Sequence, residues 1–290
     1  MNHINDINDN LFLVIEDGYN TSYIDALLTA LFYRETININ YILNNKPKKS
    51  EAYYLQELIR TKYVNLLRKN CTISSNIINE IRNYSVICGW SKDKDITELK
   101  DSSDFYLFIA ELFNIPKIEF EIIEIKNNML SQNINKISTN IITFEPTDND
   151  TIRNLMITWI NININTNINN RNNCYKLLNI PQFIILKINR FNPNGLKINH
   201  KIDIMKRIKF YGNNDTSQNY LKWKIHSMVC YNGYTNTDGK YYSIIITNDK
   251  KWLLFENNKV PSFKEINLLD SEIQNKIMND VCLLIYVLEE

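Results

Sequence analysis

A serine at the start of an apolar helical pattern is the residue best placed to do chemistry. Ser22 follows a turn-forming stretch, Asp17-Gly18-Tyr19-Asn20-Thr21, and apolar residues then recur every three or four positions from Tyr23 to Leu31. Asn20 or Thr21 can cap the predicted helix, and Asp25 falls in its first turn, where the helix dipole favours an anion. Ser22 is therefore expected at a buried helix N-terminus, where backbone N–H groups can stabilise an oxyanion. A capped core helix with no catalytic role is the alternative.

Two carboxylates form a second candidate site. Asp101 and Asp104 open an apolar pattern over 99–112 that predicts a helix, and their spacing of three places both on one face. The alternative is an acidic first turn that complements the helix dipole.

Composition excludes several classes of function. The 290-residue chain has a formal net charge of +1, so it has no general attraction to nucleic acid or to a membrane surface. The apolar run 11–15 is too short for a signal peptide, and no apolar stretch approaches the roughly 20 residues of a membrane span. We therefore expect an intracellular protein with no nucleic-acid or membrane partner. The abundance of Asn, Ile, Lys and Tyr is typical of an AT-rich genome.

The five cysteines predict neither zinc nor disulfides. None forms a C-x-x-C pair and none has a histidine at ligand spacing. We expect no metal site and no cofactor.

The order of the predicted elements indicates an α+β fold. Residues 1–10 are polar and predict a loose tail, and residues 11–290 predict a single domain. Helical patterns dominate up to residue 117, including 22–33, 51–69, 77–81 and 99–112. Strand patterns follow at 118–125, 157–168, 179–191, 206–210, 220–229, 241–247, 252–255 and 280–287.

Five stretches, in order, resemble signatures of the ubiquitin-specific proteases. The segment 20–25 with Leu31-Phe32 resembles the family's Cys box, and 99–112 resembles its second signature. Pro181 with Arg190-Phe191 resembles its central strand, and 220–226, 239–243 and 252–260 resemble its His box. The end of the chain, 280–287, resembles its closing strand. The resemblance implies a papain-like fold with a helical thumb (11–117) and an antiparallel-sheet lobe (118–290). It also implies fingers over about 118–178 that lack the family's zinc-binding cysteine pairs.

The resemblance assigns roles to eight residues. The family's nucleophile, base, orienting residue and oxyanion residue are Cys, His, Asp or Asn, and Asn; here these positions hold Ser22, Lys240, Glu256 and Asp17. The resemblance further implies binding of a ubiquitin or ubiquitin-like tail by Asp101, Asp104, His226 and Tyr241. His226 is expected near the site but not as the base.

The substitutions argue against catalysis. A serine needs a strong base, and for Lys240 to be half neutral near pH 7 its pKa would have to fall by about 3 units, or roughly 4 kcal/mol. Asp17 and Glu256 would oppose that fall, and Asp17 would also repel an oxyanion. We therefore predict that Lys240 pairs with Glu256, Asp17 or both.

This reasoning favours a non-catalytic protein that binds ubiquitin, a ubiquitin-like protein or another protein partner. Two alternatives remain: an active hydrolase that uses Ser22 with Lys240, and a structural scaffold that binds no ubiquitin. An engineered Cys→Ser change would account for Ser22 but not for Lys240 or Asp17.

Overall fold

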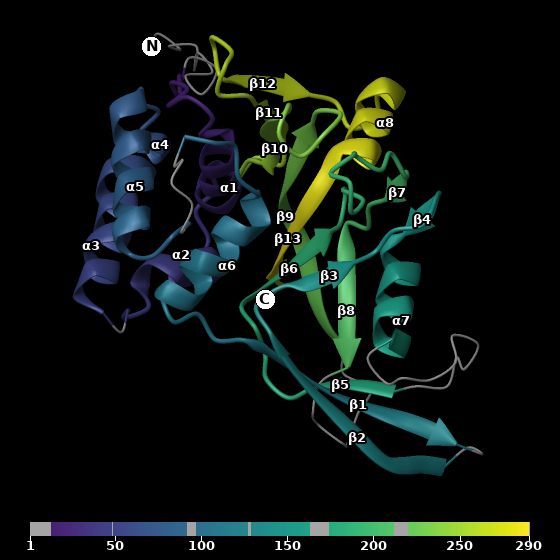
Figure 1. The fold of residues 1–290 in the computed structure, drawn as a ribbon. Coiled ribbons are helices and arrows are strands. Elements are labelled where there is room, and N and C mark those ends of the chain that lie inside the picture. Colours follow the sequence, from purple (N-terminus) through teal and green to yellow (C-terminus); the bar gives the residue numbers. More distant parts are fainter. Residues whose placement is uncertain are drawn as a thin grey trace, which may run out of the picture.

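Helices form the first part of the molecule. The computed structural model describes residues 13–47, 49–91, 97–126, 129–162, 174–211 and 220–289. Six helices gather on one side of the large sheet (Figure 1). They are α1 (Ser22–Phe32), α2 (Ile37–Asn44), α3 (Ser50–Leu58), α4 (Asn65–Arg68), α5 (Ser75–Ile87) and α6 (Ser102–Leu112), with a π-helical segment, Ile59–Val64, joining α3 to α4. The helices predicted around 22–33, 51–69, 77–81 and 99–112 are confirmed.

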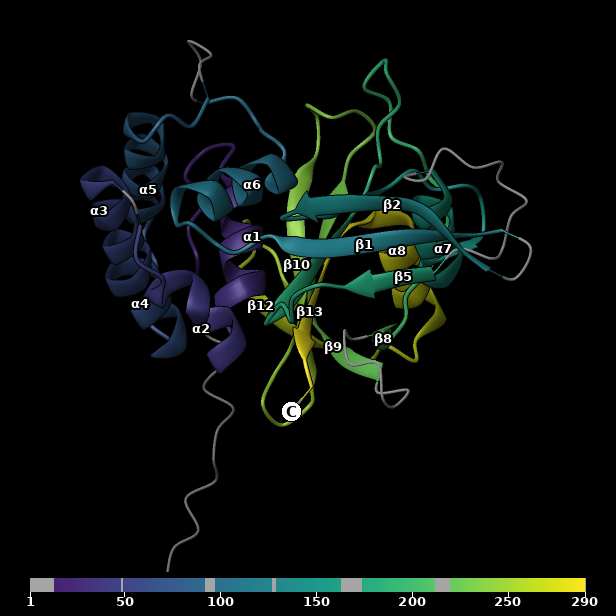
Figure 2. The same ribbon diagram turned by 90° about the horizontal axis from the view of Figure 1, so that it is seen from below.

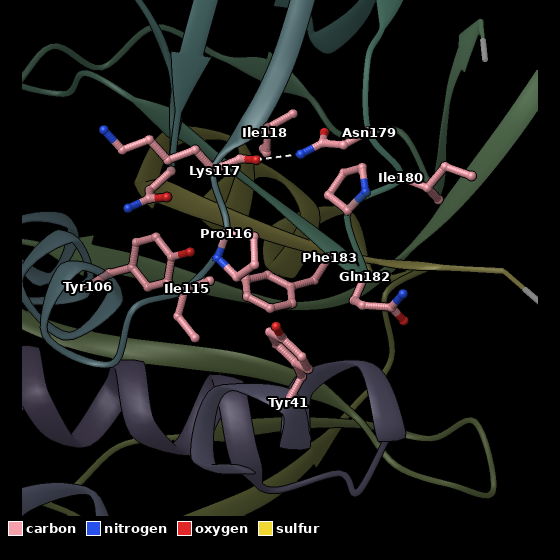
Figure 3. Close-up of a pocket in the computed structure, with 12 residues that line it drawn as sticks. Tyr41, Tyr106, Ile115, Pro116, Lys117, Ile118, Asn179, Ile180, Gln182 and Phe183 are labelled. Carbon is pink, nitrogen blue, oxygen red and sulfur yellow. Dashed lines mark hydrogen bonds between the residues drawn. The ribbon is translucent and has the colours of Figure 1, made fainter. Parts of the chain in front are cut away.

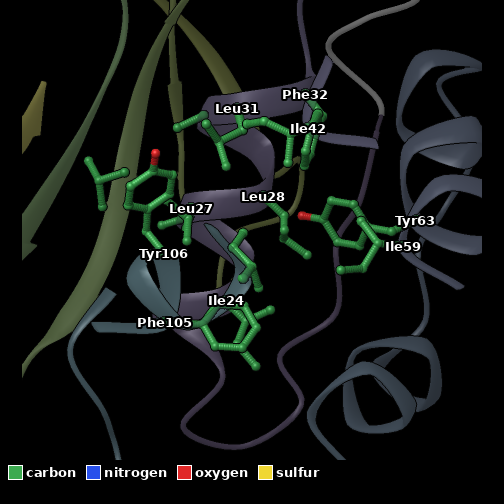
Figure 4. Packing of buried hydrophobic residues seen from close by; sticks show 14 of the residues in the cluster. Ile24, Leu27, Leu28, Leu31, Phe32, Ile42, Ile59, Tyr63, Phe105 and Tyr106 are labelled. Atoms are coloured by element: carbon green, nitrogen blue, oxygen red, sulfur yellow. The ribbon is translucent and has the colours of Figure 1, made fainter. Parts of the chain in front are cut away.

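Helix α1 lies at the centre of this packing. All eleven of its residues are buried. Leu28 faces Ile59 and Tyr63 on one side, while Leu27 lies near Tyr106 of α6 on the other (Figure 4). Each fully buried Leu or Ile side chain contributes about 1.5–3 kcal/mol through removal of its apolar surface from water. An apolar helix with no exposed face must sit between two layers, which here are the other helices and the sheet.

The second part is an eight-stranded sheet. Seven strands follow the order β12-β11-β10-β9-β13-β6-β3, and β8 pairs with β9. All pairs are antiparallel except β3 with β6. The strands are β3 (Ile142–Phe144), β6 (Phe183–Ile188), β8 (Arg207–Tyr211), β9 (Tyr220–Asn232), β10 (Lys240–Ile246), β11 (Trp252–Phe255), β12 (Phe263–Ile266) and β13 (Val281–Leu288).

Both faces of the sheet are covered. In β13, Leu283 and Ile285 belong to the core that contains α1, whereas Leu284 and Tyr286 belong to a second core on the opposite face. Helices α7 (Ile152–Ile162) and α8 (Ser271–Asp280) lie on that second side (Figure 1). A strand with two buried faces carries apolar residues at nearly every position, which explains the continuous apolar run of β6.

A separate three-stranded antiparallel sheet projects from the base of the molecule. It has the order β2-β1-β5 and consists of β1 (Ile118–Lys126), β2 (Met129–Thr139) and β5 (Cys174–Leu177) (Figures 1 and 2). Two short parallel strands, β4 (Asp150–Thr151) and β7 (Ile202–Asp203), form a third sheet. Within the ranges described above, no group of three His, Cys, Asp or Glu side chains could hold a metal ion. No helix in those ranges is long and apolar enough to cross a membrane.

The strand predicted over 157–168 is wrong as far as the structure describes it. Residues 157–162 form the end of α7, and 163–168 lie outside the described residues. The buried residues of α7 are Ile152, Leu155, Met156 and Ile160, which recur at spacings of three and four. This helical period overrides the Ile/Asn alternation that suggested a strand.

A buried arginine gives a test of how the sheet is held to the loop after β6. Arg190 is 1% exposed, and it donates hydrogen bonds to the carbonyl oxygens of Val281, Met278 and His200. We expect Arg190→Leu to lower the free energy of unfolding in urea by about 3 kcal/mol or more, because three buried carbonyls lose a charged donor. The exposed Arg153 of α7 provides the control, since Arg153→Leu should change stability by less than about 0.5 kcal/mol. Equal losses in the two variants would contradict this role.

Candidate functional site

Ser22 lies where the helical part meets the sheet. It is the first residue of α1, it is 2% exposed, and its Oγ accepts a hydrogen bond of 3.1 Å from the backbone N–H of Tyr241. Tyr241 is the second residue of β10 and directly follows Lys240. The structure therefore brings Ser22 next to Lys240 and Tyr241, although more than two hundred residues separate them along the chain.

The loop before Ser22 has a tightly determined path. Tyr19 and Asn20 both adopt left-handed backbone conformations, with φ of 66° and 55°. Arg82 of α5, itself buried, donates to the carbonyl oxygens of Tyr19 at 2.8 Å and Gly18 at 3.4 Å. A Cβ at Gly18 would lie 2.9 Å from the methyl group of Thr21, so only glycine fits there. Two strained residues are stable here because the surrounding contacts fix them.

Lys240 forms an ion pair with Asp17. Its Nζ lies 2.8 Å from Asp17 Oδ2, and the two side chains are 49% and 29% exposed. Glu256, directly after β11, lines a hollow of about 160 Å³ together with Lys240, yet it forms no ion pair with any residue that the structure describes. The predicted pairing of Lys240 is thus found with Asp17. The Lys240 Nζ donates to Asp17 Oδ2, so the contact is a charge-assisted hydrogen bond.

A buried acid, Asp25, lies three residues after Ser22. Its Oδ2 accepts hydrogen bonds from Thr21 Oγ1 at 2.9 Å and Asn257 Nδ2 at 2.7 Å, while its Oδ1 is buried without a partner in the described part of the chain. Burial, and secondarily the charge of Asp17, raises the pKa of Asp25 to about 8. The carboxyl group is therefore mainly protonated at neutral pH. Asn257 was not singled out from the sequence, although it lies within the segment that resembles the His box.

The two predicted tail-binding carboxylates share an internal cation. Asp101 caps α6 by accepting from the backbone N–H and the hydroxyl of Ser103, both at 2.6 Å. Lys187 of β6 places its Nζ 3.5 Å from Asp101 Oδ2 and 3.8 Å from Asp104 Oδ1. Asp101, Lys187 and Tyr241 line one small hollow. Asp101 is thus engaged within the protein, whereas the Asp104 side chain remains 61% exposed.

His226 does not lie near Ser22, so that prediction is wrong. Its Nε2 donates to the carbonyl oxygen of Leu31 at 3.2 Å, and its Nδ1 accepts from Arg34 Nη2 at 2.7 Å. Leu31 is nine residues after Ser22 in α1, about 14 Å away at the rise of an α-helix. Burial, with the positive charge of Arg34, lowers the pKa of His226 to about 3, so the imidazole is neutral.

The residue of β9 that lies beside the site is Tyr231. It pairs with Tyr241 in the sheet, and the centroids of the two rings are 4.9 Å apart. Its hydroxyl accepts from the Gly239 N–H at 2.8 Å and donates to the carbonyl oxygen of Thr235. A Cβ at Gly239 would lie 2.4 Å from the Tyr231 ring. Tyr231 therefore fixes the turn that delivers Lys240.

No imidazole contacts Ser22 in the described parts of the chain. Nδ1 of His200 lies 3.1 Å from the carbonyl oxygen of Pro146, and His3 falls outside the described residues.

Comparison with known proteins identifies the fold that carries this site. The family model described as ubiquitin carboxyl-terminal hydrolase matches residues 16–286. The chain belongs to the ubiquitin carboxyl-terminal hydrolase family. Its helices and antiparallel sheets form the papain-like α+β fold of the ubiquitin-specific proteases, as the sequence predicted. No curated protein sequence matches the chain significantly.

Two similar solved structures contain ubiquitin. The first is a Ubp8/Sgf11/Sus1/Sgf73 module bound to monoubiquitin, with a TM-score of 0.65, 14% identity, and coverage of 100% of this chain and 72% of that chain. The second is a Ubp8/Sgf11/Sus1/Sgf73 module bound to ubiquitin aldehyde, with a TM-score of 0.64, 13% identity, and coverage of 97% and 70%. At these identities the likeness concerns the fold alone.

The buried acid predicts an unusual dependence of stability on pH. Because the pKa of Asp25 is raised from its ordinary value near 4 to about 8, the folded chain binds more protons than the unfolded chain between these values. Asp25 should therefore make stability fall as pH rises through this window, by up to roughly 1.4 kcal/mol per pH unit. We expect Asp25→Asn to remove this contribution in urea unfolding measured from pH 5 to pH 8.5. Other titrating groups cancel in the difference between the two proteins, so parallel pH curves would refute the raised pKa.

Proposed function

We propose that this chain binds ubiquitin or a ubiquitin-like protein at the two hollows near Ser22 and does not hydrolyse it. One hollow is lined by Asp101 and Lys187 and the other by Lys240 and Glu256, and together they are called the cleft below. The observation that carries the proposal is the ion pair between Lys240 and Asp17 at the position where the family has a general base. An ammonium has no lone pair with which to accept the serine proton. The Lys240 Nζ donates a hydrogen bond to Asp17 Oδ2, whereas a base for Ser22 would have to accept one.

Among the residues that the structure describes, none beside Ser22 offers another base. The carboxyl group of Asp25 is mainly protonated near neutral pH, and its bonded oxygen is occupied by Thr21 and Asn257. The Ser22 oxygen already accepts a hydrogen bond from Tyr241, and Asp17 adds negative charge where an oxyanion would need donors. Serine is a weak nucleophile without an adjacent base, so this arrangement supports binding rather than turnover.

Charge beside the cleft supports an interaction with a cationic tail. Asp101 and Asp104 contribute two negative charges and Lys187 one positive charge, so the cluster has a net charge of −1. The more exposed carboxylate, Asp104, can accept a guanidinium from a partner. The ubiquitin present in the two similar structures is consistent with this proposal.

Two other functions make different predictions. An active hydrolase would need Lys240 to accept the proton of Ser22, whereas its Nζ donates to Asp17. A scaffold that binds no ubiquitin would retain the fold but show no saturable binding. Titration of the full chain with ubiquitin, paired with a turnover assay, separates the three.

Our prediction for turnover is that the unmodified chain does not cleave ubiquitin carrying a C-terminal fluorogenic amide. Ser22→Cys alone should also be inactive, because the base is still missing. The triple variant Ser22→Cys, Lys240→His, Asp17→Asn should gain measurable turnover, since it restores nucleophile, base and oxyanion donor together. Hydrolysis by the unmodified chain that Ser22→Ala abolishes would instead establish a hydrolase that uses serine and lysine.

Substitutions of Lys187 and of Asp104 should change the affinity for the ubiquitin tail in opposite directions. Lys187→Met removes a competing cation and is expected to tighten binding of a labelled peptide with ubiquitin's arginine-containing tail about two- to fivefold. Asp104→Asn should weaken binding by a similar factor, as measured by fluorescence anisotropy. Glu111→Gln, at an exposed position near the other end of α6, is the control and should change nothing. Measurable binding that neither variant alters would remove these residues from the site.

A further inference from the structure

A hollow of about 260 Å³ lies away from Ser22, where the helical part meets the base of the three-stranded sheet. Its walls come from α2, α6, the segment between α6 and β1, and the segment between β5 and β6 (Figure 3). It shares no lining residue with the two hollows beside Ser22 and Lys240. It is therefore a distinct concave site in the fold.

The walls of this hollow are mainly aromatic and apolar. The rings of Tyr41, Tyr106 and Phe183 border it together with Pro116 and Pro181 (Figure 3). Its volume is sufficient for one large side chain or a small organic group. Pockets of this composition bind apolar groups and orient them through a few polar atoms.

The polar atoms of this hollow have unmet hydrogen-bonding capacity. Tyr106 is 1% exposed, yet its hydroxyl has no hydrogen-bond partner among the residues that the structure describes. Tyr63 is also fully buried, but its hydroxyl lies 2.8 Å from Thr29 Oγ1 and 3.2 Å from the carbonyl oxygen of Asp25. The Tyr106 hydroxyl is not among the fully buried, unpaired side-chain atoms, so it meets solvent on the side of the hollow that Tyr106 lines. The contrast indicates that the Tyr106 hydroxyl is available to a ligand.

Two further residues define what the ligand must offer. Asn140 lines the same hollow, and its Oδ1 is buried without a partner in the described part of the chain, so it can accept one N–H. Lys117 is the single charged residue among those lining the hollow, so the site favours an acceptor or an anion over a cation. A peptide backbone supplies both a carbonyl oxygen and an N–H, and an acidic side chain would complement Lys117.

The surface around the hollow has the character of a protein contact. Ile37 is 80% exposed and lies on the same face of α2 as Tyr41, while Ile180 is 56% exposed on the opposite wall. The two walls converge at the end of β13, because Leu288 accepts from the Asn38 side chain and donates to the carbonyl oxygen of Gln182. Large apolar side chains exposed around a concave site mark an interaction surface.

We propose that this hollow binds an extended peptide segment of a protein partner. One aromatic side chain of the segment lies between Tyr41, Tyr106 and Phe183. A backbone carbonyl next to it accepts from the Tyr106 hydroxyl, and an adjacent acidic residue pairs with Lys117. This interaction goes beyond the proposed function, since it uses neither Ser22 nor the carboxylates of α6, and it stands even if the cleft binds no ubiquitin.

The test uses the full chain, labelled with ¹⁵N, and the probe acetyl-Phe-Glu-amide. We expect the probe to shift the amide resonances of the non-proline residues in 115–118 and 179–183, and acetyl-Ala-Glu-amide to leave them unchanged. Ile180→Glu should abolish binding through loss of apolar contact and added negative charge. The matched change Ile87→Glu, at an exposed isoleucine of α5, should not affect it. Shifts confined to other residues, or equal effects of the two isoleucine variants, would overturn the proposal.

A conservative variant isolates the hydroxyl. Tyr106→Phe keeps the ring and is expected to weaken binding of the probe several-fold. It should not lower the melting temperature, because no hydrogen bond to a described residue is lost. Tyr63→Phe, which removes a paired hydroxyl, should lower the melting temperature and leave probe binding unchanged. If both variants lowered the melting temperature equally, or if Tyr106→Phe bound the probe like the unmodified chain, the hydroxyl would not be a ligand contact.

Discussion

The complete burial of α1 is the constraint on which the rest of the structure depends. A helix with no exposed face cannot leave a polar side chain to water, so each one must find its partner inside the protein. Hydrogen bonds of its polar side chains join α1 to distant parts of the chain: Ser22 to the Tyr241 backbone, Tyr23 to Trp90, Asp25 to Asn257, and Thr29 to Tyr63. These contacts fix the start of α1 against the sheet and its middle against the other helices. The geometry at Ser22 is thus a consequence of core packing.

The ion pair between Lys240 and Asp17 contributes much less to stability than the burial of α1. The pair between Lys240 and Asp17 is partly exposed, and such pairs contribute about 0–1 kcal/mol to stability. Burial of the apolar side chains of α1 contributes far more, so the fold does not depend on this ion pair. In the function we propose, the pair matters for chemistry instead, because it places Lys240 and Asp17 at the positions expected to hold a base and an oxyanion donor. Loss of the reaction would therefore leave the scaffold intact.

The sequence predicted the elements that have one clear period and the contacts that join near neighbours. Helix α1, helix α6 with Asp101 at its start, and strands β8, β9, β10, β11 and β13 were placed correctly, because each carries a single apolar pattern with turn residues at its ends. Strand β12 was not predicted. Helix α7 was missed because its Ile/Asn alternation and its helical spacing overlap in the same few residues. The alternating period is more visible in the sequence, but the spacing of the buried residues decides the structure.

The apolar patterns could not predict which side chains meet across the sheet. Strand β9 is thirteen residues long, and only its pairing register with β10 shows that Tyr231, and not His226, lies beside Tyr241. The contact of Lys187 with Asp101 and Asp104 could not be predicted for the same reason. A single lysine in an apolar strand does not indicate which acidic residues pack against that strand. Arg190 fitted a family motif, yet its three carbonyl partners lie in segments far along the chain. Local periodicity specifies which face of an element is buried, whereas the residues that tune charge at the cleft are determined by the register in which those faces meet.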